Sequence, residues 1–168
     1  CPNPPQKVDP HGINVRTTSK GLELLAVNHG DREAVERFRI TIDSRPSLTW
    51  QGCYPLPPTI FANGVTGWRD DSILITSMFD PSHKESELAM LATQPVGGLW
   101  LGRANAGFER VEGIALAGAN GVVADPERNL IVAAAWRFMN QLKFSTRYFI
   151  ISRLPSSATR DMILQSLV

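Results

Sequence analysis

A threefold internal repeat is the feature that most limits what this chain can fold into. In each copy a polar residue followed by glycine opens a β-branched run, and a turn and a second apolar run come after it. The three glycines, Gly12, Gly64 and Gly121, lie 52 and 57 residues apart. Those periods slightly exceed the roughly 40 to 50 residues of a four-stranded propeller blade, which leaves room for loops. The repeat therefore predicts successive β-sheets, one in each copy.

The rest of the sequence also has the pattern of short strands joined by tight turns. Turn-forming residues occupy positions 18–21, 69–72 and 125–129. Further β-rich runs cover 34–42, 98–102 and 148–151. We expect an all-β fold in which residues 1–168 form a single partial domain, with about three blades of an incomplete β-propeller.

Since a propeller needs at least four blades to close, the remaining blades of the same propeller are the expected partner of this chain. They would come from a longer chain or from a second copy, unless the sheets adopt a different all-β arrangement. Alone, the chain is expected to be poorly stable and inactive, because uncovered sheet faces and unpaired edge strands would stay exposed.

Helix is expected only as a short insertion near 82–91. Ser82 can cap this segment, Glu85 stands three residues further on as in a capping box, and Leu88 and Leu91 share a face. The last stretch, 157–167, is compatible with either helix or strand.

Composition excludes two kinds of partner. The 17 basic and 16 acidic residues are scattered and leave a net charge of +1, so no basic stripe is present to bind nucleic acid. No apolar run reaches the roughly 20 residues of a membrane-spanning helix. Cys1 and Cys53 are compatible with a disulfide or with buried thiols, and the localisation stays open.

Polar residues at equivalent repeat positions are the candidate functional residues. The first strand of each propeller blade runs beside the central channel, so His11, Asn63 and Asn120 are expected to converge near one mouth of it. Amide oxygens are ligands that calcium accepts. The alternative is that each Asn-Gly pair only forms a tight turn. His29 joins His11 as a second candidate from the adjacent predicted strand, although a histidine in either place can serve a structural role.

Other conspicuous residues are expected to be structural. His83 lies in the polar segment before the predicted helix and should be solvated. The four tryptophans recur about once in each repeat and are expected to pack between strands: Trp50, Trp68, Trp100 and Trp136. The sequence has neither a serine-hydrolase elbow nor a phosphate-binding glycine loop.

Several motifs resemble those of the paraoxonase and arylesterase family. Residues 10–13, 24–29 and 34–38 (PHGI, LLAVNH and AVERF) are similar to the HG-containing strand, the VNH strand and the VE-x-F strand of that family. Residues 61–64 and 118–122 (FANG and GANGV) resemble its calcium-binding asparagine segments. The spacing between His11 and His29 is close to the family spacing, and the resemblance covers nearly the whole chain.

The resemblance implies a six-bladed propeller, related more distantly to gluconolactonase-type and strictosidine-synthase-type propellers. By the same match, Asn63 and Asn120 would be calcium ligands, and His11 and His29 would form a catalytic pair. The acidic ligands of the family would lie before Cys1 and after Val168.

The expected function is therefore calcium-dependent hydrolysis of a small-molecule lactone or aryl ester. The histidine pair would activate water, and calcium would polarise the carbonyl. The alternative is a propeller without hydrolase activity, either a binding module or a strictosidine-synthase-like protein. Calcium binding separates the two, because a pure scaffold would show none.

Overall fold

The computed structural model describes residues 1–136, 147–153 and 162–165, which form three four-stranded antiparallel sheets and one short helix. Sheet 1 contains β1 (Pro10–Thr18), β2 (Gly21–Asn28), β3 (Ala34–Thr41) and β4 (Ser47–Pro55). Sheet 2 contains β5 (Ala62–Gly67), β6 (Ile73–Ser77), β7 (Gly98–Arg103) and β8 (Gly107–Arg110). Sheet 3 contains β9 (Ala119–Asp125), β10 (Leu130–Trp136), β11 (Arg147–Arg153) and β12 (Met162–Gln165). The prediction of an all-β protein is confirmed.

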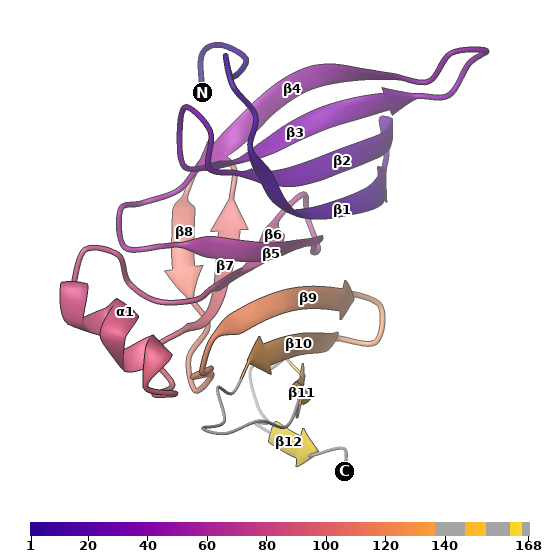
Figure 1. The fold of residues 1–168 in the computed structure, drawn as a ribbon. Coiled ribbons are helices and arrows are strands. Elements are labelled where there is room, and N and C mark those ends of the chain that lie inside the picture. The colour runs from indigo at the N-terminus through magenta and orange to yellow at the C-terminus, as the bar shows by residue number, and fades with distance from the viewer. Residues whose placement is uncertain (137–146, 154–161, 166–168) are drawn as a thin grey trace.

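Each sheet is a meander in which every strand pairs with the next one along the chain. The sheets follow one another in chain order through the molecule, with sheet 2 between the other two (Figure 1). None of the three closes on itself within the described part of the chain. The sequence left the segment 157–167 open between helix and strand, and its described part is the strand β12. The predicted strand at 148–151 lies within β11.

The predicted turns are present and their chemistry explains them. At the β1–β2 turn, the hydroxyl of Thr18 donates to the carbonyl of Gly21 over 2.9 Å. At the β5–β6 turn, Asp70 and Asp71 both have positive φ angles, 53° and 59°. Short polar residues tolerate this left-handed backbone better than branched ones. Both hairpins therefore close without an extended loop.

Two hydrophobic cores fill the spaces between neighbouring sheets. The first joins sheets 1 and 2 and contains fully buried residues such as Leu25, Val35 and Ile75. The second joins sheets 2 and 3 and includes Leu74 and Ile131. Alternate residues of a strand point to opposite faces, so β6 contributes Ile75 to the first core and Leu74 to the second. Sheet 2 is consequently covered on both faces.

The tryptophans behave largely as expected. Trp100 packs partly buried against the first core and Trp68 against the second. Trp50 donates its ring N–H to the carboxylate of Glu36 over 2.7 Å, which is a polar role that the packing prediction did not include. The side chain of Trp136 lies outside the described side chains.

The first strands of the three sheets, β1, β5 and β9, lie side by side, and we call them the leading strands. Their backbones touch at the repeat glycines. A Cβ atom on Gly12 would collide with the carbonyl oxygen of Asn63, and one on Gly64 would stand 2.6 Å from the carbonyl oxygen of Asn120. Only glycine allows backbones to approach this closely. The repeat in the sequence thus marks the line along which successive sheets meet.

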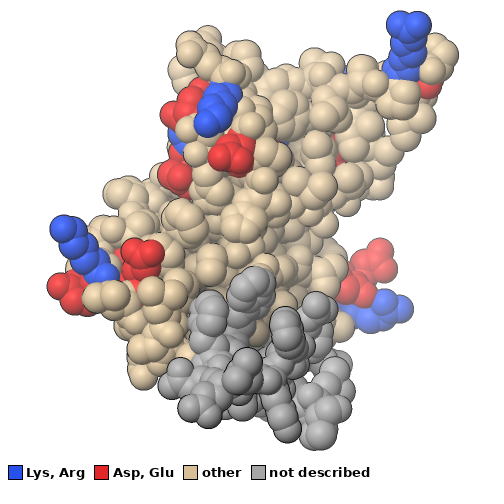
Figure 2. Space-filling model, in the orientation of Figure 1, with Lys and Arg blue, Asp and Glu red and all other residues tan. Residues whose placement is uncertain are grey.

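Apolar side chains on the outer leading strands remain exposed. Ile13 and Val15 on β1 are 64% and 53% exposed, and Val123 on β9 is 55% exposed. In Figure 2 charged side chains lie in groups at the upper left, the upper right, the left and the right of the view, and an uncharged surface crosses the middle of the described part. The leading strands at both ends of the row therefore present apolar side chains that are exposed in the described part of the chain.

The helix prediction is correct in place but wrong in its capping. Helix α1 (Lys84–Leu91) begins after His83, which provides no side-chain cap. The hydroxyl of Ser82 instead donates to the carboxylate of Asp80 over 2.6 Å, so the predicted capping box does not form. Leu88 is 67% exposed, and Met90 is the buried residue of the helix. The imidazole of His83 is exposed, as expected.

Cys1 and Cys53 form a disulfide that ties the N-terminal segment to β4, with 5.6 Å between their Cα atoms. This decides between the two alternatives that the sequence left open for the cysteines. The N-terminal segment leads directly into β1, so the bond also restrains the approach of the chain to His11.

Candidate functional site

The two predicted histidines lie next to each other at one end of sheet 1. His11 is the second residue of β1, and His29 directly follows β2. The pairing of β1 with β2 places Pro10 opposite Asn28, so the two histidines emerge at the same end of the hairpin. Nδ1 of His11 is 3.4 Å from Nε2 of His29, and the rings meet edge to face with their centroids 5.5 Å apart. The pairing of β1 with β2 therefore brings two histidines that are 18 residues apart in the sequence into contact.

A third residue, Glu33, extends this pair. Its Oε2 lies 2.7 Å from Nδ1 of His29, four residues away along the loop between β2 and β3. Sequence analysis missed Glu33. A carboxylate in the loop 29–33, close to His29, could have indicated a partner for it, but the loop contains two, Asp31 and Glu33. The carboxylate of Asp31 accepts the backbone N–H of Gln6 over 2.7 Å and does not bind His29. Only the folded loop distinguishes the two.

The contacts assign the protons on both rings. An ionised carboxylate only accepts hydrogen bonds, so Nδ1 of His29 carries the proton that it donates to Glu33. Nε2 of His29 is then an acceptor, and it faces the Nδ1–H of His11. This leaves Nε2 of His11 with a lone pair that no hydrogen bond from a described residue occupies, on an exposed ring. The tautomers follow from the hydrogen-bond network.

Buried Asn28 holds the two histidine segments together. Its side chain is fully buried, and its Oδ1 accepts the backbone N–H groups of Asp9 over 2.8 Å and Gly30 over 3.0 Å. The backbone N–H of His29 in turn donates to the carbonyl of Asp9 over 3.1 Å. Asp9 lies two residues before His11, so these bonds fix the entry to β1 against the loop that carries His29.

An aromatic stack connects the histidine pair to sheet 2. The ring of Phe61 stacks on His29 at 4.9 Å between centroids and on Phe79 at 5.0 Å, with interplanar angles of 15° and 21°. Phe61 immediately precedes β5, which carries Asn63. The stack limits the rotation of the His29 ring and gives the pair an apolar flank.

The two predicted asparagines lie on neighbouring leading strands. Asn63 on β5 is 5% exposed, and its backbone adjoins Gly12, the residue after His11. Asn120 on β9 is half-buried, and its backbone adjoins Gly64. The row therefore runs from His11 through Asn63 to Asn120, with β5 between the other two strands.

The side-chain oxygens of both asparagines are uncommitted among the described residues. The amide nitrogen of Asn63 donates to the sulfur of Met78 over 3.1 Å, and neither side-chain oxygen accepts a hydrogen bond there. The backbone carbonyl of Asn120 instead accepts the hydroxyl of Thr76. Two neutral amide oxygens suit a hard cation such as calcium, which takes six to eight oxygen ligands. In the described part of the chain, no group of three or more His, Cys, Asp or Glu is arranged to hold a metal ion.

Comparison with known proteins adds no assignment. No protein-family model matches the sequence. No curated protein matches it either. In the described ranges, no helix has both the length and the apolar character required to cross a membrane.

Proposed function

We propose that this chain forms three successive blades of a six-bladed β-propeller that hydrolyses lactones or aryl esters with the help of calcium. The observation that carries the proposal is the contact between His11 and His29, extended by Glu33, beside the row of repeat asparagines. Two histidines 18 residues apart have no reason to meet unless the hairpin and its loop hold them there.

The arrangement of the sheets supports the propeller part of the proposal. Three four-stranded meanders follow one another, and each begins with a leading strand that touches the next. The blades of a propeller have this order, with their first strands around a common channel. The exposed Ile13, Val15 and Val123 on the outer leading strands are the surface that the remaining blades would cover.

In the proposed reaction His11 is the general base. Its free Nε2 takes a proton from water as the water oxygen attacks the carbonyl carbon of the ester. His29 stabilises the charged His11 ring through Nε2, while Glu33 holds the Nδ1 proton of His29 in place. The C–O bond to the leaving group then breaks, and the proton on His11 passes to the leaving oxygen.

Asn63 and Asn120 are the residues of this chain that would hold calcium. When bound, the ion supplies positive charge that polarises the carbonyl and stabilises the oxyanion. Neutral amide ligands leave most of the ionic charge available to the substrate. The other ligands of the six to eight required would come from outside the described residues.

The second candidate is a propeller of the binding-module or strictosidine-synthase type, without hydrolase activity. The observation in its favour is that the described residues include no group of three or more His, Cys, Asp or Glu that could hold a metal ion, so that the Asn-Gly pairs would have a structural role only. In that case calcium would neither bind stoichiometrically nor raise the melting temperature.

The test is the hydrolysis of a series of lactones and aryl esters by the complete protein, before and after removal of calcium by a chelator. The proposal expects activity that is lost with calcium and restored on its return. His11→Gln should reduce kcat by about 100-fold or more, the usual contribution of a positioned general base. The exposed His83, replaced by Gln, is the matched control. Activity that persists unchanged in chelator would end the calcium mechanism, and unchanged activity in His11→Gln would end the role of the histidine.

A further inference from the structure

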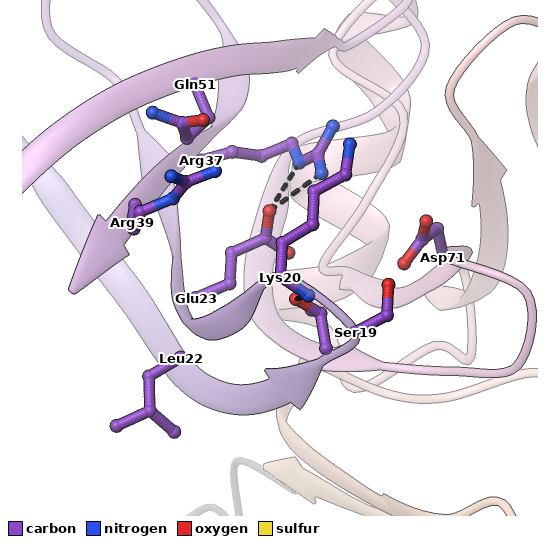
Figure 3. A pocket seen from close by; sticks show the side chains of 9 residues that line it. Ser19, Lys20, Leu22, Glu23, Arg37, Arg39, Gln51 and Asp71 are labelled. Carbon is purple, nitrogen blue, oxygen red and sulfur yellow. Dashed lines mark hydrogen bonds and ion pairs between the residues drawn. The ribbon is translucent and has the colours of Figure 1, made fainter. Parts of the chain in front are cut away.

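A recess lies at the opposite end of β1 from the histidine pair. It has a volume of about 120 Å³ and opens between sheet 1 and the β5–β6 turn. Its charged and amide-bearing lining residues, shown in Figure 3, are Lys20, Glu23, Arg37, Arg39, Gln51 and Asp71. Drug-sized ligands occupy pockets of roughly 300–1,000 Å³, so this recess suits a much smaller group.

The recess is built around one buried carboxylate that two arginines share. Oε2 of Glu23 accepts Nε of Arg16 over 2.7 Å, and Oε1 accepts Nε of Arg37 over 2.9 Å. The side chain of Glu23 is only 7% exposed. One carboxylate neutralises one guanidinium, so this cluster retains one positive charge in a partly buried place, where water screens it less than at the surface.

Two more cationic side chains, Lys20 and Arg39, line the same recess and have no ion-pair partner among the described residues. Arg39 lies directly opposite Glu23 in the pairing of β2 with β3, and Arg37 is two residues along on the same face. Lys20 reaches over from the β1–β2 turn (Figure 3). Among the described residues, the side chains of Lys20 and Arg39 form neither an ion pair nor a hydrogen bond. Both are exposed and free to turn toward a ligand.

The total charge of the recess is therefore positive. The lining carries three cations, Lys20, Arg37 and Arg39, and two carboxylates, Glu23 and Asp71. Arg16 is not part of the lining, but it shares the carboxylate of Glu23 with Arg37, so that the lining and Arg16 together have two more cations than carboxylates. Asp71 stands on the side of the recess away from Arg39 (Figure 3). The excess of two charges matches a dianion, and arginine binds oxyanions through paired N–H groups.

We propose that this recess binds a small tetrahedral dianion of the phosphate or sulfate type, with Lys20 and Arg39 closing over it and Arg37 behind it. The site is separate from the histidine pair, because the two lie at opposite ends of β1. It requires no hydrolase activity, so its test is independent of the function proposed above.

The test is a calorimetric titration of the protein with sodium sulfate, which stays a dianion throughout the neutral pH range, against sodium chloride at equal ionic strength. We expect saturable one-to-one binding of sulfate and none of chloride. The double variant Lys20→Met, Arg39→Met should weaken sulfate binding by about tenfold or more, since it removes two charge-assisted contacts. These substitutions break no side-chain hydrogen bond or ion pair among the described residues, so the variant should fold.

The control variant removes the same total charge elsewhere. Lys84→Met, Arg103→Met alters two exposed cations on helix α1 and sheet 2 and should leave sulfate affinity unchanged. A parallel titration with glycerol 3-phosphate distinguishes a free ion from a phosphate monoester, and the tighter ligand identifies the natural form. Non-saturable binding, or equal weakening in both double variants, would overturn the proposal.

Discussion

Gly64 lies so close to Asn120 that a Cβ atom on Gly64 would stand 2.6 Å from the asparagine carbonyl oxygen. Gly64→Ala should therefore push β5 and β9 apart and reduce the free energy of unfolding by about 1–3 kcal/mol, the usual cost of overpacking. Gly121→Ala is the matched variant, because a Cβ there meets nothing within 4 Å. Thermal or urea unfolding of both variants measures the difference.

Gly121 also tests whether further blades follow. In residues 1–168 alone, Gly121→Ala should cost much less than Gly64→Ala. In a complete propeller the next leading strand would lie against β9, and Gly121→Ala should then cost about as much as Gly64→Ala. A complete protein that tolerates alanine at position 121 would contradict the proposed continuation of the row.

Glu33 should control the proton position on His29. In Glu33→Gln the amide can either accept from Nδ1 or donate to it, so the single tautomer is lost together with the negative charge. In the proposed hydrolase we expect kcat/KM to fall by roughly 10- to 100-fold, the range found for carboxylates that orient metal-bound histidines. Nitrogen-15 NMR of His29 reads the tautomer directly and does not depend on activity. Glu112→Gln, on an exposed loop, is the control. A proton on Nε2 of His29 in the unaltered protein would refute the assignment.

Glu36 should be among the most costly residues of sheet 1 to truncate. Its fully buried carboxylate accepts Nε and Nη2 of Arg32 over 2.7 and 2.9 Å and the ring N–H of Trp50 over 2.7 Å. Glu36→Ala leaves the indole N–H of half-buried Trp50 unpaired and Arg32 without its partner, at an expected cost of about 3–5 kcal/mol. Glu109→Ala, which breaks an exposed pair with Arg103, should cost less than about 1 kcal/mol. Chemical denaturation gives both values, and similar costs would show that the Glu36 network adds little.

Reduction of the Cys1–Cys53 disulfide should loosen the N-terminal segment and, through it, the loop that carries His29. The bond closes a loop with a sequence separation of 52, so its loss is expected to cost about 2–4 kcal/mol. Hydrogen exchange should rise first at His29 and Gly30, whose backbone N–H groups depend on Asp9 and Asn28. The double variant Cys1→Ser, Cys53→Ser should behave in the same way without a reductant. An unchanged melting temperature after verified reduction would contradict this.

Low pH should loosen the N-terminal segment before β1, because the carboxylate of Asp31 holds this segment at Gln6. The backbone N–H of Gln6 donates to Asp31 and holds the pKa of that carboxyl below its ordinary value of 3.8. A carboxyl whose pKa is lower in the folded state adds stability above its unfolded pKa and loses it as the pH falls toward the folded one. The contribution is therefore complete above about pH 4 to 5 and declines at lower pH. Asp31→Asn should flatten this part of the curve of unfolding free energy against pH. An equally steep decline in the unaltered protein and in the variant would exclude Asp31 as its source.

Local chemistry explains why much of the fold was predictable. The glycine repeat predicted three sheets because each copy opens a strand in the same way, and close backbone contact requires the glycine at positions 12 and 64. The turn residues predicted the hairpins because left-handed backbone requires particular side chains. The capping box failed for a similar local reason, since Ser82 has a nearer partner in Asp80 than the helix N-terminus.

The candidate site was predictable only in part. The sequence alone determined the histidine pair as candidates, the equivalence of Asn63 and Asn120, and the strand-turn-strand order of each sheet, because these depend on residue type and spacing along one chain. The tertiary structure decided that Glu33 rather than Asp31 binds His29, that Asn28 joins the two histidine segments, and that Arg16 and Arg37 share Glu23. Those choices depend on which side chains the packed sheets bring within about 3 Å, a distance that no spacing along the chain specifies.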